Sequence, residues 1–192
     1  MKPITLTGRF VTLVPLAQSH LTGLQEAAAD GELWKLFYTS VPKPEEMQAW
    51  LDNALELQAK NEALPFVVLE NFSGKVVGTT RYCNLDLLNR RLEIGYTWYA
   101  KRSQRTAINT ECKLLLLRHA FEQINCIAVE FRTSWYNQPS QRAIERLGAK
   151  RDGVLRNHKI MPNGSIRDTV VYSILNSEWP GLEENLKFKL DR

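Results

Sequence analysis

The segment from residue 104 to residue 149 constrains the fold of this chain more than any other. A polar turn at residues 104–109 opens an apolar stretch of helical length that ends near Phe121. A β-rich run follows at residues 126–133, and then Asn137-Gln138-Pro139-Ser140 opens a second helix that closes at Gly148-Ala149. This order places the free N–H groups of a helix start beside the end of a strand, which makes an anion-binding site. A phosphate-bearing cofactor held there would suit group transfer.

Bulk properties narrow the class of protein. A chain of 192 residues is long enough for one domain with a full core, and we expect a single domain over residues 1–192. No apolar run approaches the roughly 20 residues that span a bilayer, and the amino terminus lacks an apolar signal core, so we expect no membrane partner. The three cysteines show no metal-binding spacing and cannot all pair, which favours a reducing cytoplasm and no metal. A formal charge of +4 permits an anionic cofactor but does not indicate a nucleic-acid partner.

Apolar periodicity and turn residues predict the remaining elements. We expect one strand over residues 7–16, a helix capped by Ser19 that runs to about Ala29, and a helix over residues 44–60 that begins at a proline. Further strands are expected at residues 65–70, 75–84, 91–99, 126–133, 149–157 and 169–175. Hairpin turns are expected at residues 71–74 and 162–164, and a short helix in the tail. Strands that later alternate with helices predict an α/β fold, with a mixed sheet flanked by helices on both faces.

The strand at residues 91–99 carries a candidate general base. Its alternation puts Leu92, Ile94, Tyr96 and Trp98 on one face, and Glu93, Gly95 and Thr97 on the other. Glu93 therefore faces either solvent or a cleft. An alkyl amine is mostly protonated near neutral pH and must lose a proton before it can attack a carbonyl group. A carboxylate can take that proton, directly or through a water molecule.

Several motifs together resemble one acyltransferase family. They are the turn Gln104-Arg105-Thr106-Ala107-Ile108-Asn109 with Thr110-Glu111, then Asn137-x-x-Ser140, Leu147-Gly148-Ala149, Glu93-Ile94-Gly95-Tyr96 and Leu6-x-Gly8-Arg9-x-Val11-x-Leu13. In this order the chain resembles the GNAT superfamily, and within it the RimJ/RimL-like branch of ribosomal-protein N-terminal acetyltransferases. The resemblance covers nearly the whole chain. It implies a single, mostly antiparallel twisted sheet and an N-acetyltransferase that uses acetyl-CoA without a metal.

The resemblance also assigns roles to residues of this chain. It implies that the coenzyme contacts Tyr96, Thr97, Trp98, Arg102, Gln104, Arg105, Thr106, Ala107, Ile108, Asn109, Asn137 and Ser140. A strand N–H group between Tyr96 and Trp98 would polarise the acyl carbonyl. Ser140 would protonate the leaving thiolate, since Ile144 occupies the place where many relatives carry a tyrosine. Water could replace Ser140 in that role, and capping is a sufficient role for Asn137.

The resemblance implies that the acceptor is an amine, either a protein N-terminus or a small molecule. Candidate residues for its pocket are Trp34, Arg81, Tyr82, Asn84, Arg156 and His158. Core packing for Trp34 and an ordinary surface loop for His158 are the alternatives. Because the pocket carries arginines, a strongly cationic acceptor is not favoured. Ala107, Asn109 and Ile144 depart from the family pattern, so a non-catalytic acyl-CoA-binding or sensor protein remains an alternative. A homodimer is compatible with either reading.

Overall fold

A computed structural model describes residues 1–161 and 163–192, and one eight-stranded sheet forms its centre. The strands lie in the order β1-β2-β3-β4-β5-β6-β8-β7, and only the β5–β6 pair is parallel. The predicted mixed, mostly antiparallel sheet is therefore confirmed. The strands are β1 (Leu6–Thr7), β2 (Val11–Pro15), β3 (Leu64–Glu70), β4 (Val76–Asp86), β5 (Arg91–Tyr99), β6 (Ala128–Ser134), β7 (Lys150–Ile160) and β8 (Ile166–Leu175).

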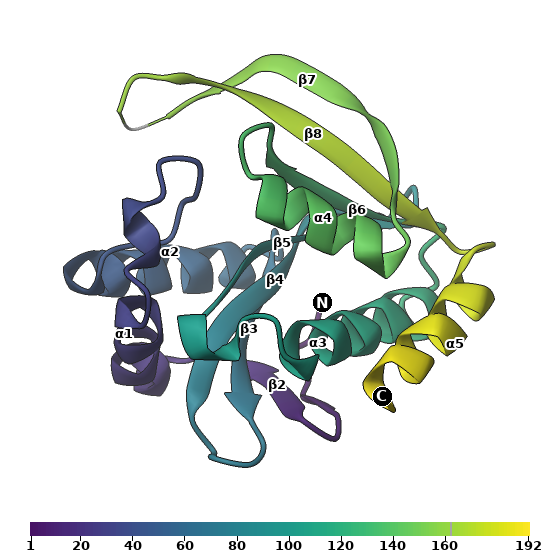
Figure 1. Ribbon diagram of the computed structural model, residues 1–192, viewed down its shortest axis with the longest axis horizontal. Helices are drawn as coiled ribbons and strands as arrows, with labels where there is room; N and C mark the ends of the chain where they lie inside the picture. Colours follow the sequence, from purple (N-terminus) through teal and green to yellow (C-terminus); the bar gives the residue numbers. More distant parts are fainter. Residues whose placement is uncertain (162) are drawn as a thin grey trace.

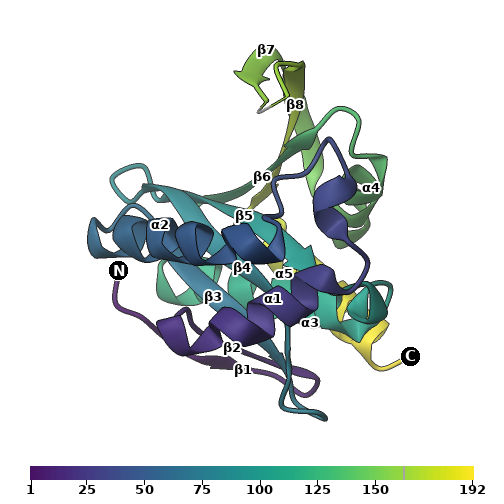
Figure 2. The same ribbon diagram turned by 90° about the vertical axis from the view of Figure 1, so that its left-hand side faces the viewer.

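Helices cover both faces of this sheet, as predicted (Figures 1 and 2). On one face lie α1 (Leu21–Ala29) and α2 (Met47–Ala59), whose buried side chains form one apolar cluster with residues of the sheet. On the other lie α3 (Ala107–Arg118), α4 (Gln138–Leu147) and α5 (Trp179–Leu190), which share a second, larger cluster. We call these the α1/α2 face and the α3 face. No helix in the described part of the chain is long and apolar enough to cross a membrane.

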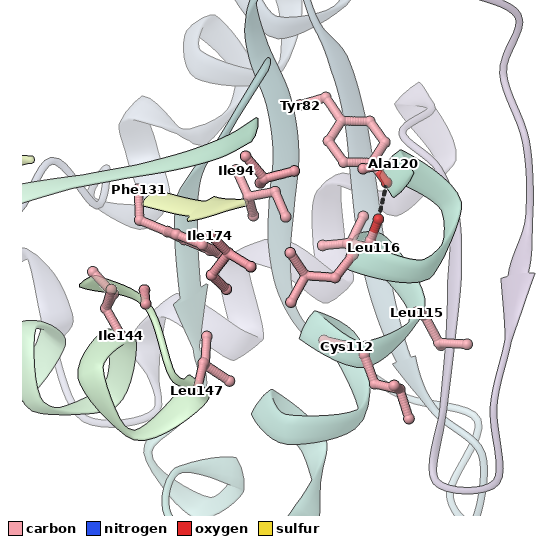
Figure 3. Close-up of a cluster of buried hydrophobic side chains, with 14 of the residues drawn as sticks. Tyr82, Ile94, Cys112, Leu115, Leu116, Ala120, Phe131, Ile144, Leu147 and Ile174 are labelled. Atoms are coloured by element: carbon pink, nitrogen blue, oxygen red, sulfur yellow. Dashed lines mark hydrogen bonds between the residues drawn. The ribbon is translucent and has the colours of Figure 1, made fainter. Parts of the chain in front are cut away.

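The larger cluster fixes which side chains of β4 and β5 lie on the α3 face. Tyr82 and Ile94 point into it beside Leu116 of α3 (Figure 3). The Tyr82 hydroxyl is fully buried and donates a hydrogen bond to the Leu116 carbonyl oxygen at 2.6 Å. The prediction that Tyr82 lines the acceptor pocket is therefore wrong. Alternation along β4 instead places Arg81 and Cys83 on the opposite, α1/α2 face.

Strand β5 does not keep the predicted alternation. Tyr96 has a left-handed backbone (φ 52°), and the register with β4 shifts between Thr79 and Arg81. This bulge turns the strand beyond it by one position. Trp98 therefore packs into the α1/α2 cluster, and Thr97 faces Lys113 of α3. The prediction that Tyr96 and Trp98 share a face with Leu92 and Ile94 is wrong, because a strict period of two cannot anticipate an extra residue.

Two predictions near the amino terminus are also wrong. The strand expected over residues 7–16 is two strands, because the chain turns between Thr7 and Val11 to place backbone N–H groups on the Glu111 carboxylate. Ser19 does not cap the first helix. A short 3₁₀ turn at Gln18–His20 precedes α1, and the ring of His20 accepts a hydrogen bond from the Ala17 backbone N–H at 3.1 Å.

Later elements agree with the prediction except at their ends. Helix α4 closes at Gly148 with φ 107°, and α5 forms in the tail. The helix expected to reach Phe121 ends as an α-helix at Arg118 and continues as a π turn at His119–Gln123. Strand β7 extends past residue 157 to Ile160. Of the turn expected at residues 162–164, Pro162 lies outside the described residues.

Candidate active site

Strands β5 and β6 are paired over only three residues and then part. The pairing joins Arg91–Glu93 to Ala128–Glu130, and beyond it β5 continues to Tyr99 and β6 to Ser134 without a shared register. The stretch of β5 from residue 94 to 99 therefore keeps a backbone edge with which no described strand pairs. We call the place where β5 and β6 diverge the wedge. Because the two strands are parallel, the helices that follow them, α3 and α4, both begin at the open end of this wedge (Figure 1).

The start of α3 lies where the predicted phosphate-binding turn ends. Thr106 is the N-cap, and its hydroxyl accepts a hydrogen bond from the Ile108 N–H at 3.3 Å. Ala107, Ile108 and Asn109 form the first helical turn, and the Ile108 N–H group is taken by the cap. The N–H groups of Ala107 and Asn109 point out of the helix start. Arg105 precedes them with a left-handed backbone (φ 61°) and an exposed side chain.

Arg102 and Gln104, which precede α3 in the predicted coenzyme-binding turn, have side chains with protein partners. The Arg102 guanidinium contacts Asp30 at 2.9 Å, and the Gln104 amide donates to the Tyr99 carbonyl oxygen at 3.1 Å. These contacts tie the turn to α1 and to the end of β5. Arg105 forms no ion pair with any described residue and is a cation available at this helix start.

Helix α4 begins with the predicted cap. The Asn137 side-chain oxygen accepts a hydrogen bond from the Ser140 N–H at 3.1 Å, which confirms its capping role. The Ser140 hydroxyl is half-buried and has no hydrogen-bond partner among the described residues. It is therefore a polar group at a helix start that is free to meet a ligand.

Glu93 lies at the point where β5 and β6 part. Its side chain is buried, with 7% of the residue exposed, and it lines a cavity of about 240 Å³ on the α1/α2 face with Asn84, Arg91, Glu130 and Arg132. The Asn84 amide donates to its carboxylate at 2.6 Å, and the Arg132 Nε lies 3.5 Å from it. Burial raises the pKa of Glu93, while Asn84 and Arg132 oppose that rise. A carboxylate with a raised pKa is a better proton acceptor than an ordinary surface glutamate.

Gly95 opens the space beside this carboxylate. A methyl group at Gly95 would lie 2.9 Å from the Glu93 Oε1 and 3.2 Å from the Cys83 sulfur atom. The first contact is shorter than side chains normally show and the second is tight, so an added methyl group would push the Glu93 carboxylate away. The glycine therefore allows Glu93 to lie against the strand next to the Tyr96 bulge.

Residues 11–150 match the family described as the acetyltransferase (GNAT) domain. The chain belongs to the GNAT acetyltransferase family.

The chain is 34% identical over 110 residues to "Putative ribosomal N-acetyltransferase YdaF" of Bacillus subtilis, an alignment that spans 57% of this chain and 59% of that protein. It is also 31% identical to a crystal structure of a GCN5-related N-acetyltransferase from Brucella melitensis, with a TM-score of 0.88 over 99% of this chain and 86% of that one. The structure of Mycobacterium smegmatis RimJ in complex with CoA-disulfide shares the fold, with 19% identity and a TM-score of 0.82 over 100% of this chain and 98% of that one. These relatives agree with the RimJ/RimL-like branch that the motifs indicated.

The other predicted pocket residues are Trp34, Arg156 and His158. Trp34 packs against the α1/α2 cluster, which is the core role named as its alternative. Arg156 is exposed on β7, and His158 on the same strand shares a hydrogen bond of 3.1 Å with the Thr169 hydroxyl. Burial and the neighbouring cations Lys159, Arg132 and Arg167 lower the pKa of His158.

Three functional candidates were missed in the sequence. Arg132 approaches Glu93 from β6, and Arg167 of β8 lines a cavity of about 200 Å³ with Phe37, Tyr38, Ser134, Tyr136, Met161, Asn163, Ser165 and Ile166. Lys113 is buried in α3 and donates to the Thr97 hydroxyl at 2.7 Å. Alternation in β6 and β8 could have indicated the two arginines, since Glu130, Arg132 and Arg167 share the face of Glu93.

Proposed function

We propose that this GNAT acetyltransferase transfers an acetyl group from acetyl-CoA to a primary amine, on a protein N-terminus or on a small molecule. The observation that carries the proposal is the parting of β5 from β6 after Glu93, with the starts of α3 and α4 at the open end of the wedge. The thioester would lie in the wedge, between an unpaired strand edge and a buried carboxylate.

The start of α3 supports the placement of the coenzyme. Its free N–H groups and helix dipole favour a pyrophosphate, and Arg105 adds a positive charge there. Ala107 and Asn109 are compatible with this role because neither carries a bulky or acidic side chain. The bulge at Tyr96 adds an irregular stretch of backbone whose N–H groups can meet the acyl oxygen.

Glu93 is the base in this proposal. It takes a proton from the acceptor ammonium group, directly or through water. The neutral nitrogen then attacks the acetyl carbonyl carbon, the C–N bond forms and the C–S bond breaks. The coenzyme thiolate leaves. The proton that the nitrogen loses as the amide forms reaches the thiolate through the Ser140 hydroxyl, which gives one proton and takes up another, or through water. Much of the rate would come from holding the two substrates together.

Thermal unfolding with coenzyme A tests the coenzyme site. A ligand that binds only the folded state raises Tm by mass action, so millimolar coenzyme A should raise Tm. Ala107→Asp should abolish this increase, because the new carboxylate would crowd and repel the phosphates at the helix start. Gly181→Asp is the matched control, since it places the same charge in the first turn of α5, where the added side chain meets nothing within 4 Å. An increase that survives Ala107→Asp would place the coenzyme elsewhere.

Acetyl transfer to a panel of simple amines and peptides tests the reaction itself. We expect free thiol and acetylated amine to appear in equal amounts. If coenzyme A protects the protein but no amine in the panel is acetylated, the non-catalytic binding alternative is favoured.

A further inference from the structure

Arg81 is a buried cation with no acidic partner among the described residues. It lies in β4 on the α1/α2 face and is 2% exposed. Its guanidinium carbon lies 4.1 Å from the centre of the Tyr96 ring and 5.0 Å from that of Trp50. The two rings cover the guanidinium, and its Nε is shielded from solvent without a hydrogen-bond partner.

The N–H groups in the plane of the Arg81 guanidinium are therefore the part of this side chain that can still bind a ligand. A guanidinium group has five N–H donors in one plane, which match the two oxygens of a carboxylate. Aromatic rings compensate part of the charge but accept no hydrogen bonds in that plane. Burial lowers the pKa of Arg81, as expected for a cation that lacks a carboxylate neighbour.

The strand register places Arg81 close to Glu93. Arg81 pairs with Gly95 and Cys83 pairs with Glu93, so Arg81 and Glu93 project from the same face two residues apart along the strands. Two residues correspond to about 7 Å. Gly95 lies between them without a side chain, and the Glu93 carboxylate already leans over it. If the acceptor amine lies at Glu93, another group of the same molecule, only a few bonds from the amine, can therefore reach Arg81.

The surroundings of this site are also cationic. Arg167 has a shielded Nε without a hydrogen-bond partner, and it belongs to the same region because Glu93 and Tyr96 raise its pKa against the effect of burial. The second acid beside Glu93, Glu130, is already paired with Arg91 at 2.6 Å and Arg132 at 2.9 Å. Two arginines near Glu93, Arg81 and Arg167, thus form no ion pair with any described residue.

We propose that the acceptor is an amine that also carries a carboxylate, with the amine at Glu93 and the carboxylate on the stacked guanidinium of Arg81, supported by the charge of Arg167. This inference rests on the proposed acetyl transfer. It narrows the acceptor to a free amino acid or a peptide whose first residues include an acidic side chain. Both supply the same chemistry.

A coenzyme phosphate is the other anion that could bind Arg81, but the position of Arg81 along β4 argues against this. Tyr99, at the end of β5 that leads towards α3, pairs with Gly78, while Arg81 pairs with Gly95. The four residues from Gly95 to Tyr99 correspond to about 13 Å along the strand. Arg81 therefore lies on the acceptor side of the wedge.

The experiment compares matched acceptors that differ only in charge. One pair is a free amino acid and its amide; the other is a pair of short peptides with Asp or Asn at the second position. For the unmodified protein we expect kcat/KM to favour the carboxylate of at least one pair by on the order of 10²-fold, because an isosteric amide leaves a buried charge unpaired. The pair that shows the preference identifies the source of the carboxylate.

Variants of Arg81 separate recognition from folding. Arg81→Met, which keeps an unbranched apolar chain, should remove the preference by lowering kcat/KM for the carboxylate acceptor far more than for its amide, mainly through a higher KM. Arg81→Lys should restore part of the preference. Arg151→Met is the control, because Arg151 also stacks on an aromatic ring, 5.1 Å from the centre of Trp135, but lies exposed on β7. An increase in Tm with coenzyme A verifies that each variant is folded.

The outcomes distinguish this inference from the proposed function. Equal kcat/KM for both members of both pairs, or an equal loss for both in Arg81→Met, would overturn the carboxylate site while leaving acetyl transfer intact. If no amine is acetylated, the proposed reaction fails. The carboxylate site is then judged by whether the carboxylate amine, and not its amide, raises Tm in the presence of coenzyme A and loses that effect in Arg81→Met. If Arg81→Met lowers the increase in Tm caused by coenzyme A alone, the arginine serves the coenzyme and the inference is wrong.

Discussion

The two faces of the sheet differ in whether their buried charged groups find hydrogen-bond partners within the protein. On the α3 face, the Glu111 carboxylate accepts three backbone hydrogen bonds, from Arg9, Phe10 and Val11, at 2.6 to 2.8 Å. Lys113, two residues later, donates to the hydroxyls of Thr97 and Thr80 at 2.7 and 3.4 Å. Both charges are therefore met by fixed polar groups of the protein.

On the α1/α2 face the corresponding groups are not all met. Arg81 and Arg167 each keep a shielded nitrogen without a hydrogen-bond partner, and burial raises the pKa of Glu93 despite Asn84 and Arg132. Buried polar groups are usually satisfied, and exceptions need an explanation such as a ligand or a catalytic role. The comparison indicates that Glu111 on the α3 face stabilises the fold, whereas the unmatched polar groups of the α1/α2 face are available to bind a substrate in the proposed reaction.

The largest expected effect comes from Glu111→Ala. This variant leaves three backbone N–H groups of the turn between β1 and β2 without their acceptor. We expect a loss of about 3 kcal/mol or more in the free energy of unfolding, since each unsatisfied buried donor costs about 1–3 kcal/mol. Urea denaturation measures the loss. Glu56→Ala is the control, because the exposed pair of Glu56 with Lys60 should contribute little.

A small stability change in Glu111→Ala would contradict the structural role of the α3-face charges. The close fit of the Glu111 carboxylate against the turn supports a large loss of stability. A methyl group at Gly8 would lie 2.6 Å from the Glu111 Oε2, so no water molecule fits between this carboxylate and the turn.

Glu93→Gln should have the opposite profile, with activity lost and stability gained. The amide keeps the shape but cannot accept the proton, so we expect a rate lower by on the order of 10²-fold. The loss should shrink as pH rises towards the pKa of the amine, because the acceptor then arrives deprotonated. Coenzyme binding should be nearly unchanged. Full activity near neutral pH would make Glu93 a structural residue, and water or His158 would be the base.

The stability of Glu93→Gln follows from the direction of the pKa shift. The raised pKa of Glu93 means that the folded state binds its proton more tightly than the unfolded chain does. The charged carboxylate therefore lowers stability at neutral pH, and this penalty disappears as pH falls through the pKa of Glu93 and then the ordinary pKa of glutamate. Tm of Glu93→Gln should exceed that of the parent at neutral pH, and the two should converge in acid. Glu184→Gln, at an exposed position of α5, is the control.

Local signals in the sequence were sufficient to predict some features of this site. Asn137, Pro139 and Gly148 mark both ends of α4, because capping, proline at a helix start and a left-handed glycine act within a few residues. The position of Glu93 on a face opposite to Leu92 and Ile94 also followed from the alternation of β5.

Other features depend on contacts between distant segments. Glu111 lies 100 residues from Val11, and no periodicity connects an acidic residue in a helix with a turn between two early strands. The bulge at Tyr96 reversed the faces of Thr97 and Trp98, since its register is set by β4 and not by β5 alone. The unpartnered state of Arg81 could not be predicted either, because it depends on rings from α2 and β5 that meet only in the fold.

Lys113→Met sharpens the comparison on the α3 face. Burial lowers the pKa of Lys113 from 10.5 to about 8, so between these values the unfolded chain holds the proton and the folded protein does not. Stability contributed by this group should therefore rise as pH increases from about 8 to 10.5, and below about 8 the penalty for the buried charge is fully present. The difference in unfolding free energy between parent and variant should change by up to about 3 kcal/mol across this window, since each pKa unit corresponds to about 1.4 kcal/mol.

Taking the difference between parent and variant removes the contribution of buried tyrosines and cysteines that titrate in the same range. Urea denaturation at several pH values gives the curve. A difference that stays constant with pH would mean that Lys113 keeps its proton in the folded protein, as a cation held by Thr97 and Thr80.

Ser140→Ala has the smallest expected effect and extends the comparison to the start of α4. Asn137 is engaged there as a cap, whereas the Ser140 hydroxyl has no partner among the described residues. If the hydroxyl protonates the thiolate, turnover should fall by about tenfold while coenzyme affinity stays the same, because the group acts only as the C–S bond breaks. Asn137→Ala should instead lower stability by about 1 kcal/mol through loss of the cap. Steady-state kinetics and coenzyme titration separate the two. Normal turnover in Ser140→Ala would leave water as the proton donor and make Ser140, like Asn137, a residue of the helix start alone.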